Sequence, residues 1–254
     1  MRLPVIRGVI DRRILVNYRV APEVLAKTLP PPFRPKLYNG HGVAGICLIR
    51  LQGMRPRFLP RWIGMASENA AHRTAVEWDE NDGICQGVYV RRRDSSSWLN
   101  AMAGGRLFPG IHFHARFTVQ EAGDHVEVSV RSDDGTTSLA VVGDVCSELP
   151  AGSSFGSLIA ASEFFEAGAV GYSDTPEAGR FRGMELRCQR WQVEPLAVSA
   201  VRSSVFDDRQ LFPAGSIEFD SALLMRGIEH EWHGRSDLCC GPQAPARAGL
   251  GEPL

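Results

Sequence analysis

The sequence predicts a mainly β (α+β) fold, a single antiparallel β-barrel with a few peripheral helices. Apolar residues fall in alternating or doubly apolar runs of strand length over most of the 254 residues. Turn-forming clusters such as DENDG, EAGD and SDDG separate consecutive runs, which is typical of a meander of antiparallel strands. We therefore expect one domain over residues 1–238, followed by a disordered Pro-, Gly- and Ala-rich tail at 239–254.

The predicted strands can be followed along the chain. HGVAGICLIRL at 41–51 is apolar on both faces and reads as a buried strand. The runs at 70–78 and 83–92 form a hairpin through DENDG, and IHFHARFTV at 111–119 alternates cleanly between apolar and polar residues. Further strands are expected at 125–130, 136–145, 184–193, 196–206 and 216–233.

Three segments have helical signals. PEVLAKTL at 22–29 begins with proline and an acid and stops before three prolines. SWLNAMA at 97–103 is long enough for one or two turns before Gly104-Gly105, and 154–167 has an early serine and apolar residues at helical spacing.

Composition excludes several classes of protein. The 28 basic and 29 acidic residues give a net charge of −1, so no basic surface indicates nucleic acid. No apolar stretch approaches the length of a membrane span and no secretory segment is visible, so we expect a cytoplasmic protein without a membrane partner. The six cysteines have no CxxC spacing, and Cys47 in VAGICLI reads as a small buried hydrophobe. The sequence leaves the oligomeric state open, a homo-oligomer included.

The segment YRVAPEVLAKTLPPPF (18–33) has a strand end, a short helix and a proline-marked exit, and it resembles the opening of acetoacetate decarboxylases. GVAGICLIRLQGMRPRFLPRW (42–62) is similar to the DUF2071 (YqjF-like) family of the same superfamily. HRTAV (72–76) and CQRWQVEPLAV (188–198) agree with that family, so the resemblance covers about residues 10–235. It implies a single cone-shaped β-barrel with an interior cavity.

The resemblance does not carry over the catalytic lysine of the decarboxylases. Their adjacent lysines follow the strand that corresponds to GVYVRRR, where this chain has DSSSWL at 94–99. Lys27 and Lys36 are the only lysines, and they fall in a surface helix and a proline-rich loop. We therefore expect no decarboxylation through an imine, whose lysine needs a pocket that lowers the amine pKa.

A cluster of arginines is the candidate ligand site. Strand parity predicts that Tyr89, Arg91 and Arg93 share one face, with Arg73 on the strand paired through the DENDG turn. If that face is the barrel interior, the guanidiniums bind a carboxylate or phosphate. The alternatives are a solvated strand end for RRRDSSS and a structural ion pair between Arg73 and Glu77.

Acid–base candidates are fewer. Glu68 is either a partner of Arg73 or a general base, and His112 is a candidate proton-transfer group. His112 and His114, with the EHEWH segment at 229–233, contain the residue types of a His₂-carboxylate metal site. No predicted pairing joins the two segments, so we expect neither a metal nor a cofactor.

RPRFLPRWIGM at 55–65 mixes arginines with large apolar residues. It reads as a lid or packing loop in preference to a membrane-surface loop or an RNA contact, because Pro56 and Pro60 exclude an amphipathic helix.

The function that these expectations favour is binding of a small, anionic organic acid or carbonyl compound inside the barrel, with a lyase or isomerase step that uses no Schiff base. A non-catalytic binding or sensory protein on the same barrel is the alternative. A third hypothesis is an interaction protein whose barrel is filled by side chains, and the presence of a cavity discriminates against it.

Overall fold

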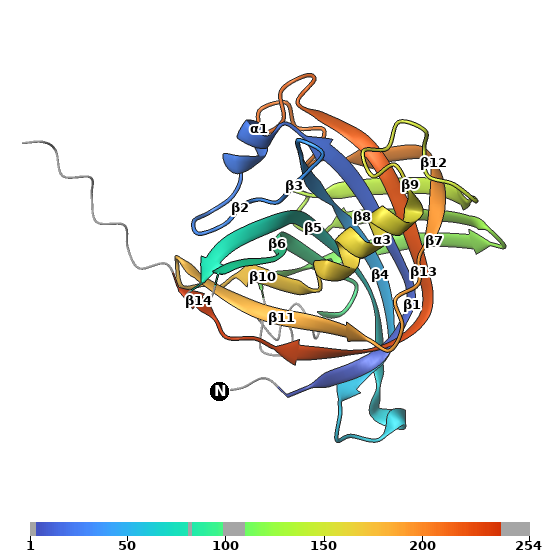
Figure 1. The fold of residues 1–254 in the computed structure, drawn as a ribbon. Helices are drawn as coiled ribbons and strands as arrows, with labels where there is room; N and C mark the ends of the chain where they lie inside the picture. Colours follow the sequence, from blue (N-terminus) through green and yellow to red (C-terminus); the bar gives the residue numbers. More distant parts are fainter. Residues whose placement is uncertain (1–3, 81–82, 99–109, 240–254) are drawn as a thin grey trace, which may run out of the picture.

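A computed structural model describes residues 4–80, 83–98 and 110–239, and within them the chain folds into one 14-stranded mixed sheet with two α-helices (Figure 1). The elements are β1 (Ile6–Val20), α1 (Pro22–Ala26), β2 (Arg34–Pro35), β3 (Leu37–Tyr38), β4 (His41–Pro56), the 3₁₀ turn η1 (Arg61–Ile63), β5 (Met65–Glu80), β6 (Gly83–Ser95), β7 (His112–Ala122), β8 (His125–Ser132), β9 (Ser138–Val145), α3 (Leu158–Ala167), β10 (Val170–Asp174), β11 (Arg180–Cys188), β12 (Glu194–Ser203), β13 (Ile217–Gly234) and β14 (Leu238–Cys239).

The strand pairings close on themselves, as a barrel requires. A large circuit runs through β6, β7, β8, β9, β12, β13, β1, β4 and β5 and returns to β6. A small circuit leaves β6 through β10 and β11 and rejoins the first at β13. The long strands β13, β1, β4, β5 and β6 belong to both circuits, so each of their two faces lines a different interior.

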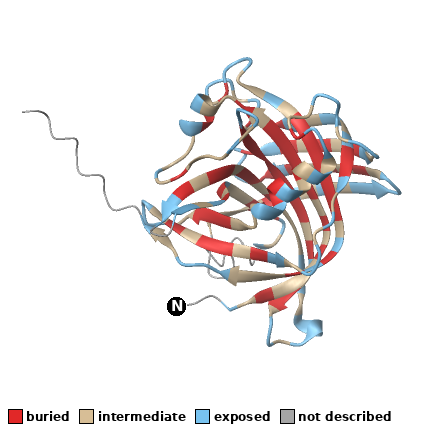
Figure 2. Cartoon of the chain, viewed as in Figure 1, coloured by how far each residue is buried: buried red, intermediate tan, exposed pale blue. Residues whose placement is uncertain are grey.

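Successive side chains along these shared strands point alternately into the two interiors. Ile14 and Leu224 point into the large circuit, which apolar side chains fill as the main hydrophobic core. Leu15 and Cys47 point to the other face, beneath α3. Figure 2 shows that the buried residues concentrate on these long strands. One interior is therefore packed, and the other is free to hold a cavity.

Both helices that the structure describes in full were predicted from the sequence. α3 begins one residue after Ser157, whose hydroxyl accepts a hydrogen bond from the Ala160 amide at 3.2 Å. α1 starts at Pro22 as expected and ends with Lys27 at its C-cap, shorter than 22–29. The helix expected at 97–103 lies mostly outside the described residues. Of the tail expected at 239–254, Cys239 is described and ends β14, paired with Arg180, and the other residues lie outside the described range.

The predicted mainly β fold is confirmed, with two corrections. β7 pairs with β6 in parallel, and β10 also pairs with β6 in parallel, where an antiparallel meander was expected. The chain between Ser95 and His112 is long enough for the crossover that a parallel pair needs. In addition, β10 was not predicted as a strand, and of β1 the sequence indicated only its end, at 18–20, although β1 lies at the centre of the sheet between β13 and β4.

The segment at 55–65 joins β4 to β5 and projects from the body of the protein (Figure 1). Phe58 and Trp62 on it are 79% and 83% exposed. Within the part of the chain that the structure covers, no helix has the length and hydropathy to cross a membrane.

Candidate functional site

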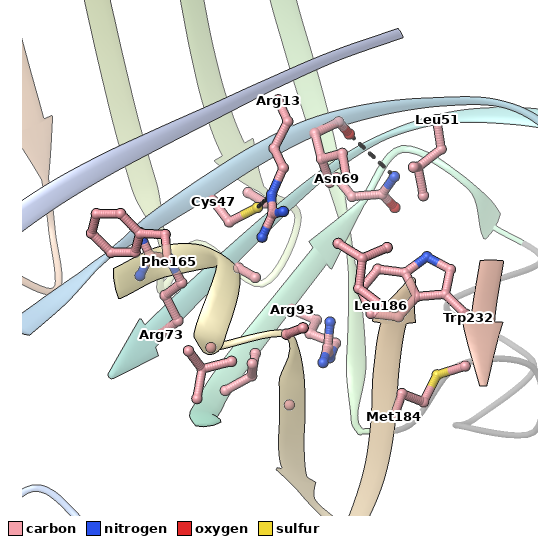
Figure 3. A pocket seen from close by; sticks show the side chains of 18 of the residues that line it. Arg13, Cys47, Leu51, Asn69, Arg73, Arg93, Phe165, Met184, Leu186 and Trp232 are labelled. Carbon is pink, nitrogen blue, oxygen red and sulfur yellow. Dashed lines mark hydrogen bonds between the residues drawn. The ribbon is translucent and has the colours of Figure 1, made fainter. Parts of the chain in front are cut away.

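A cavity of about 100 Å³ lies inside the small circuit, several times the space that one water molecule requires. The shared strands form one wall, and β10, β11 and the C-terminal end of α3 form the other (Figure 3). Most of its lining is apolar: Ile49, Leu51, Val88, Val90, Phe165, Met184, Leu186, Trp191 and Trp232. Its polar lining comes from Arg13, Cys47, Asn69, Arg73, Arg93, Asp94 and His112.

Arg73 is buried in this wall, 5% exposed. One of its terminal nitrogens donates a hydrogen bond to Asn17 Oδ1 at 2.5 Å, and its guanidinium lies 4.8 Å from the centre of the Phe165 ring. The paired residue on β4 is Gly45, and a Cβ there would lie 3.4 Å from the Arg73 terminal nitrogen. Burial lowers the pKa of Arg73 to about 10, because the charged form loses its hydration.

Arg73 therefore pairs with a neutral amide and not with Glu77 or Glu68. Glu77 lies near Arg34, at 3.7 Å. The buried Nε of Arg73 has no hydrogen-bond partner among the described residues.

Arg13 comes from the part of β1 that the sequence did not predict as a strand. Its Nε donates to the Cys47 sulfur at 3.3 Å, and its guanidinium lies 5.7 Å from the centre of the Trp191 ring. Had residues 6–20 been interpreted as a strand, the alternation of side chains would have placed Arg13 and Leu15 on the same face. That pattern is the feature of the sequence from which Arg13 could have been predicted.

Arg93 reaches the cavity from β6, where its Nε donates to the Ser173 hydroxyl at 3.2 Å. Burial lowers its pKa to about 10. The pairing of β5 with β6 shifts here, because His72 faces Arg92 while Arg73 faces Val90, so that Arg91 is an extra, bulged residue.

This bulge breaks the parity on which the predicted cluster rested. Arg91 is exposed. Tyr89 is buried on the face opposite the cavity, in an aromatic cluster with Phe33, and its hydroxyl donates to Asp174 at 2.7 Å. Of the four predicted ligand-binding residues, the structure brings Arg73 and Arg93 together at the cavity and leaves Tyr89 and Arg91 elsewhere.

The cavity carries unbalanced positive charge. Across residues 4–80, 83–98 and 110–239, Arg13, Arg73 and Arg93 make no ion pair with a carboxylate. Asp94 also lines the cavity, but it is bound by Arg92 at 2.9 Å. Because an unpaired buried charge is costly, such a site is electrostatically matched to an anion.

The two acid–base candidates fall in different places. Glu68 is held between Arg12 at 2.5 Å and Arg50 at 2.6 Å, and it does not line the cavity. His112 does line the cavity, and the pairing of β7 with β6 places it beside Arg93 on the neighbouring strand.

The residues considered for a metal are not gathered into one site. His114 contacts Asp133 at 2.7 Å, while His233 contacts Glu231 at 2.9 Å. In the described portion of the chain, no three His, Cys, Asp or Glu side chains are placed to hold a metal ion. The 55–65 segment contributes no residue to the cavity lining.

The lysines also lie away from the cavity. The Lys36 ammonium sits 4.3 Å from the centre of the Phe164 ring, and burial lowers its pKa. Neither Lys36 nor Lys27 is among the lining residues.

Comparison with known proteins supports the fold. The DUF2071 family model, described as an uncharacterized conserved protein, matches residues 10–225, and no curated protein matches the sequence. The acetoacetate decarboxylase of Legionella pneumophila superposes with a TM-score of 0.59 at 12% identity, over 92% of this chain and 88% of that chain. The enduracididine biosynthesis enzyme MppR complexed with pyruvate gives 0.56 at 12% identity, over 94% and 91%. An acetoacetate decarboxylase-like enzyme of Sphingomonas wittichii gives 0.57 at 11% identity, over 94% and 93%. At these identities the likeness is one of fold.

Proposed function

The chain belongs to the DUF2071 family of uncharacterized conserved proteins, and we propose that it binds a small organic carboxylate in the cavity of its barrel. The observation that carries this proposal is the convergence of Arg13, Arg73 and Arg93 on one cavity without a carboxylate partner among the described residues. Guanidinium groups bind carboxylates through charge-assisted hydrogen bonds, and these bonds strengthen where water is excluded.

The remaining lining matches the rest of such a ligand. Phe165, Trp191, Leu186 and Trp232 form apolar walls around the arginines. A ligand with a carboxylate head and a short carbon chain satisfies both surfaces, whereas free phosphate would contact the apolar walls without benefit. The cavity volume of about 100 Å³ limits the ligand to a few heavy atoms.

The comparison with MppR is consistent with this class of ligand. That protein, of similar fold, has been solved in complex with pyruvate, a small carboxylate. In the present chain, binding proceeds without an imine because neither of its two lysines lines the cavity.

Position favours His112 as the acid–base group if the bound carboxylate also reacts. It lines the cavity on the strand next to Arg93. An imidazole beside the arginine that holds the carboxylate can give a proton to the bound ligand or take one from it. A lyase or isomerase step is therefore the catalytic form of the proposal, and a binding or sensory protein is its non-catalytic form.

Two arginines two positions apart provide a matched test. A thermal-shift and calorimetric screen of small carboxylates should find a stabilising ligand. Arg93→Met should then weaken its binding by about 10- to 150-fold, since one lost charge-assisted contact costs about 1.5–3 kcal/mol. Arg91→Met removes the same charge at the exposed bulge and should leave binding unchanged. Equal effects of the two variants, or the absence of any stabilising carboxylate, would contradict the proposal.

A further inference from the structure

Cys47 occupies a position that the proposed binding role does not use. It lines the cavity from β4, is 8% exposed, and is a free thiol. Its sulfur accepts the hydrogen bond from Arg13 Nε at 3.3 Å (Figure 3). A cysteine that served only as a small hydrophobe would not need a guanidinium directed at its sulfur.

The other two cavity arginines also act on this sulfur. Arg73 and Arg93 line the same cavity as Cys47, and each guanidinium lies within electrostatic range of its sulfur. Reactive cysteines lie beside cationic side chains of this kind.

A second observation indicates that a ligand belongs next to this thiol. Arg73 is 5% exposed, and its Nε lacks a hydrogen-bond partner within the described chain. The hydrogen bond that its guanidinium does donate goes to the neutral Asn17. The same cavity thus holds a nucleophile and a buried donor that still needs an acceptor.

We propose that Cys47 is a nucleophile that forms a reversible covalent bond with the carbonyl carbon of a small oxo-carboxylate. This inference rests on the proposed function, because the carboxylate must be held by the cavity arginines. A carbonyl is the favoured electrophile because three guanidiniums exceed what one carboxylate needs. One of them remains to stabilise the negative charge that develops on the carbonyl oxygen.

The step is balanced without any further reactant. The Cys47 thiol releases its proton to solvent, and the sulfur forms a bond to the carbonyl carbon. The π electron pair of the C=O bond moves to the oxygen, which takes up a proton from solvent. The product is a thiohemiacetal, and the addition needs no oxidant or reductant.

The test compares two alkylating agents of similar size, anionic iodoacetate and neutral iodoacetamide, on the intact protein, with peptide mapping of each cysteine. At Cys47 iodoacetate should react about tenfold faster than iodoacetamide, because a cationic cleft concentrates anions. Cys146 and Cys239, which lie outside the cavity, should show no such preference. Pyruvate should slow alkylation of Cys47 more than propionate does at the same concentration. Only pyruvate has a ketone carbonyl carbon to which the Cys47 sulfur can form a bond.

Variants separate this inference from the proposed function. Arg13→Met should abolish the iodoacetate preference at Cys47, and Arg13→Lys should restore part of it, with rates at Cys239 unchanged in both. Cys47→Ser should keep carboxylate binding in the thermal-shift assay. If Cys47→Ser binds carboxylates while wild-type Cys47 shows no preference for iodoacetate, the nucleophile is refuted and the binding function stands. If no carboxylate binds and Cys47 shows no preference, both are refuted. Equal protection by pyruvate and propionate would overturn the covalent step.

Discussion

Replacing Arg73 with methionine should make the unliganded protein more stable while removing its affinity for carboxylates. Burial lowers the pKa of Arg73 to about 10. With each pKa unit worth ~1.4 kcal/mol, keeping this side chain charged in the fold costs about 3 kcal/mol at neutral pH. Methionine has a similar length and retains the contact with Phe165 through its sulfur.

The loss of one hydrogen bond opposes this gain. Asn17 is fully buried, and its Oδ1 loses the hydrogen bond from Arg73. An acceptor left unsatisfied in this way costs about 1–3 kcal/mol. The net change for Arg73→Met is therefore an increase of about 1 kcal/mol in the free energy of unfolding, which raises Tm by about 2–4 °C.

A double variant measures how far Asn17 is the source of that opposing cost. Asn17→Leu with Arg73→Met removes the unsatisfied Oδ1, but it also removes the hydrogen bonds that Asn17 Nδ2 donates to Leu15 O at 3.2 Å and to Ser221 Oγ at 3.5 Å. Because these two effects oppose each other, the double variant should lie within about 1 kcal/mol of Arg73→Met alone.

The measurement is urea unfolding followed by tryptophan fluorescence in a buffer without organic anions, because a bound ligand would stabilise the wild-type protein by itself. Carboxylate binding is measured on the same samples. A loss of more than about 2 kcal/mol in Arg73→Met would refute the reasoning, since it would mean that the Arg73 charge is satisfied in the unliganded fold.

Other buried or paired groups lead to three more expected outcomes. Burial lowers the pKa of both His72 and His230 to about 4, so below pH 6.5 the folded state binds fewer protons than the unfolded state. The free energy of unfolding should therefore be highest above pH 6.5. It should fall as the pH drops towards 4, by roughly 3 kcal/mol for each histidine. Measured by chemical unfolding at a series of pH values, His230→Phe should lose about half as much stability on acidification as the wild-type protein. The same pH dependence in both proteins would contradict this role of His230. Borohydride treatment with acetoacetate or pyruvate should leave Lys36 without a mass adduct, because its ammonium packs on Phe164 outside the cavity; a specific adduct there would restore imine chemistry. Glu68→Gln should destabilise the protein by about 1.5–3 kcal/mol in chemical unfolding and should leave carboxylate binding intact. The buried Arg12 loses one of its two charged partners and keeps Glu121. Reduced affinity in the folded variant would place Glu68 in the ligand site.

Much of the local structure of this protein follows from its sequence alone. The doubly apolar run at 41–51, and the strand-length runs at 70–78 and 83–92 joined by the DENDG turn, identified three of the long strands. The helix expected at 154–167 from an early serine and helical spacing is present, but it begins at Leu158, after the capping Ser157. The lack of lysine in the segment after β6 is a property of the sequence, and it leaves no amine there to form a Schiff base.

Which side chains meet depends instead on how the strands pair. Parity placed Tyr89, Arg91 and Arg93 on one face, but the bulge at Arg91 moves Arg93 to the cavity and leaves Tyr89 on the opposite face. A bulge is a property of two paired strands, and one inserted residue reverses every side chain beyond it.

Arg13 and Cys47 meet for a similar reason. They lie on β1 and β4, and their contact exists because these two strands pair between Arg13 and Ile49. The sequence pattern fixes which residues can share a strand face. The pairing of distant strands, which is set by the packing of the whole barrel, fixes which of those faces lines the cavity.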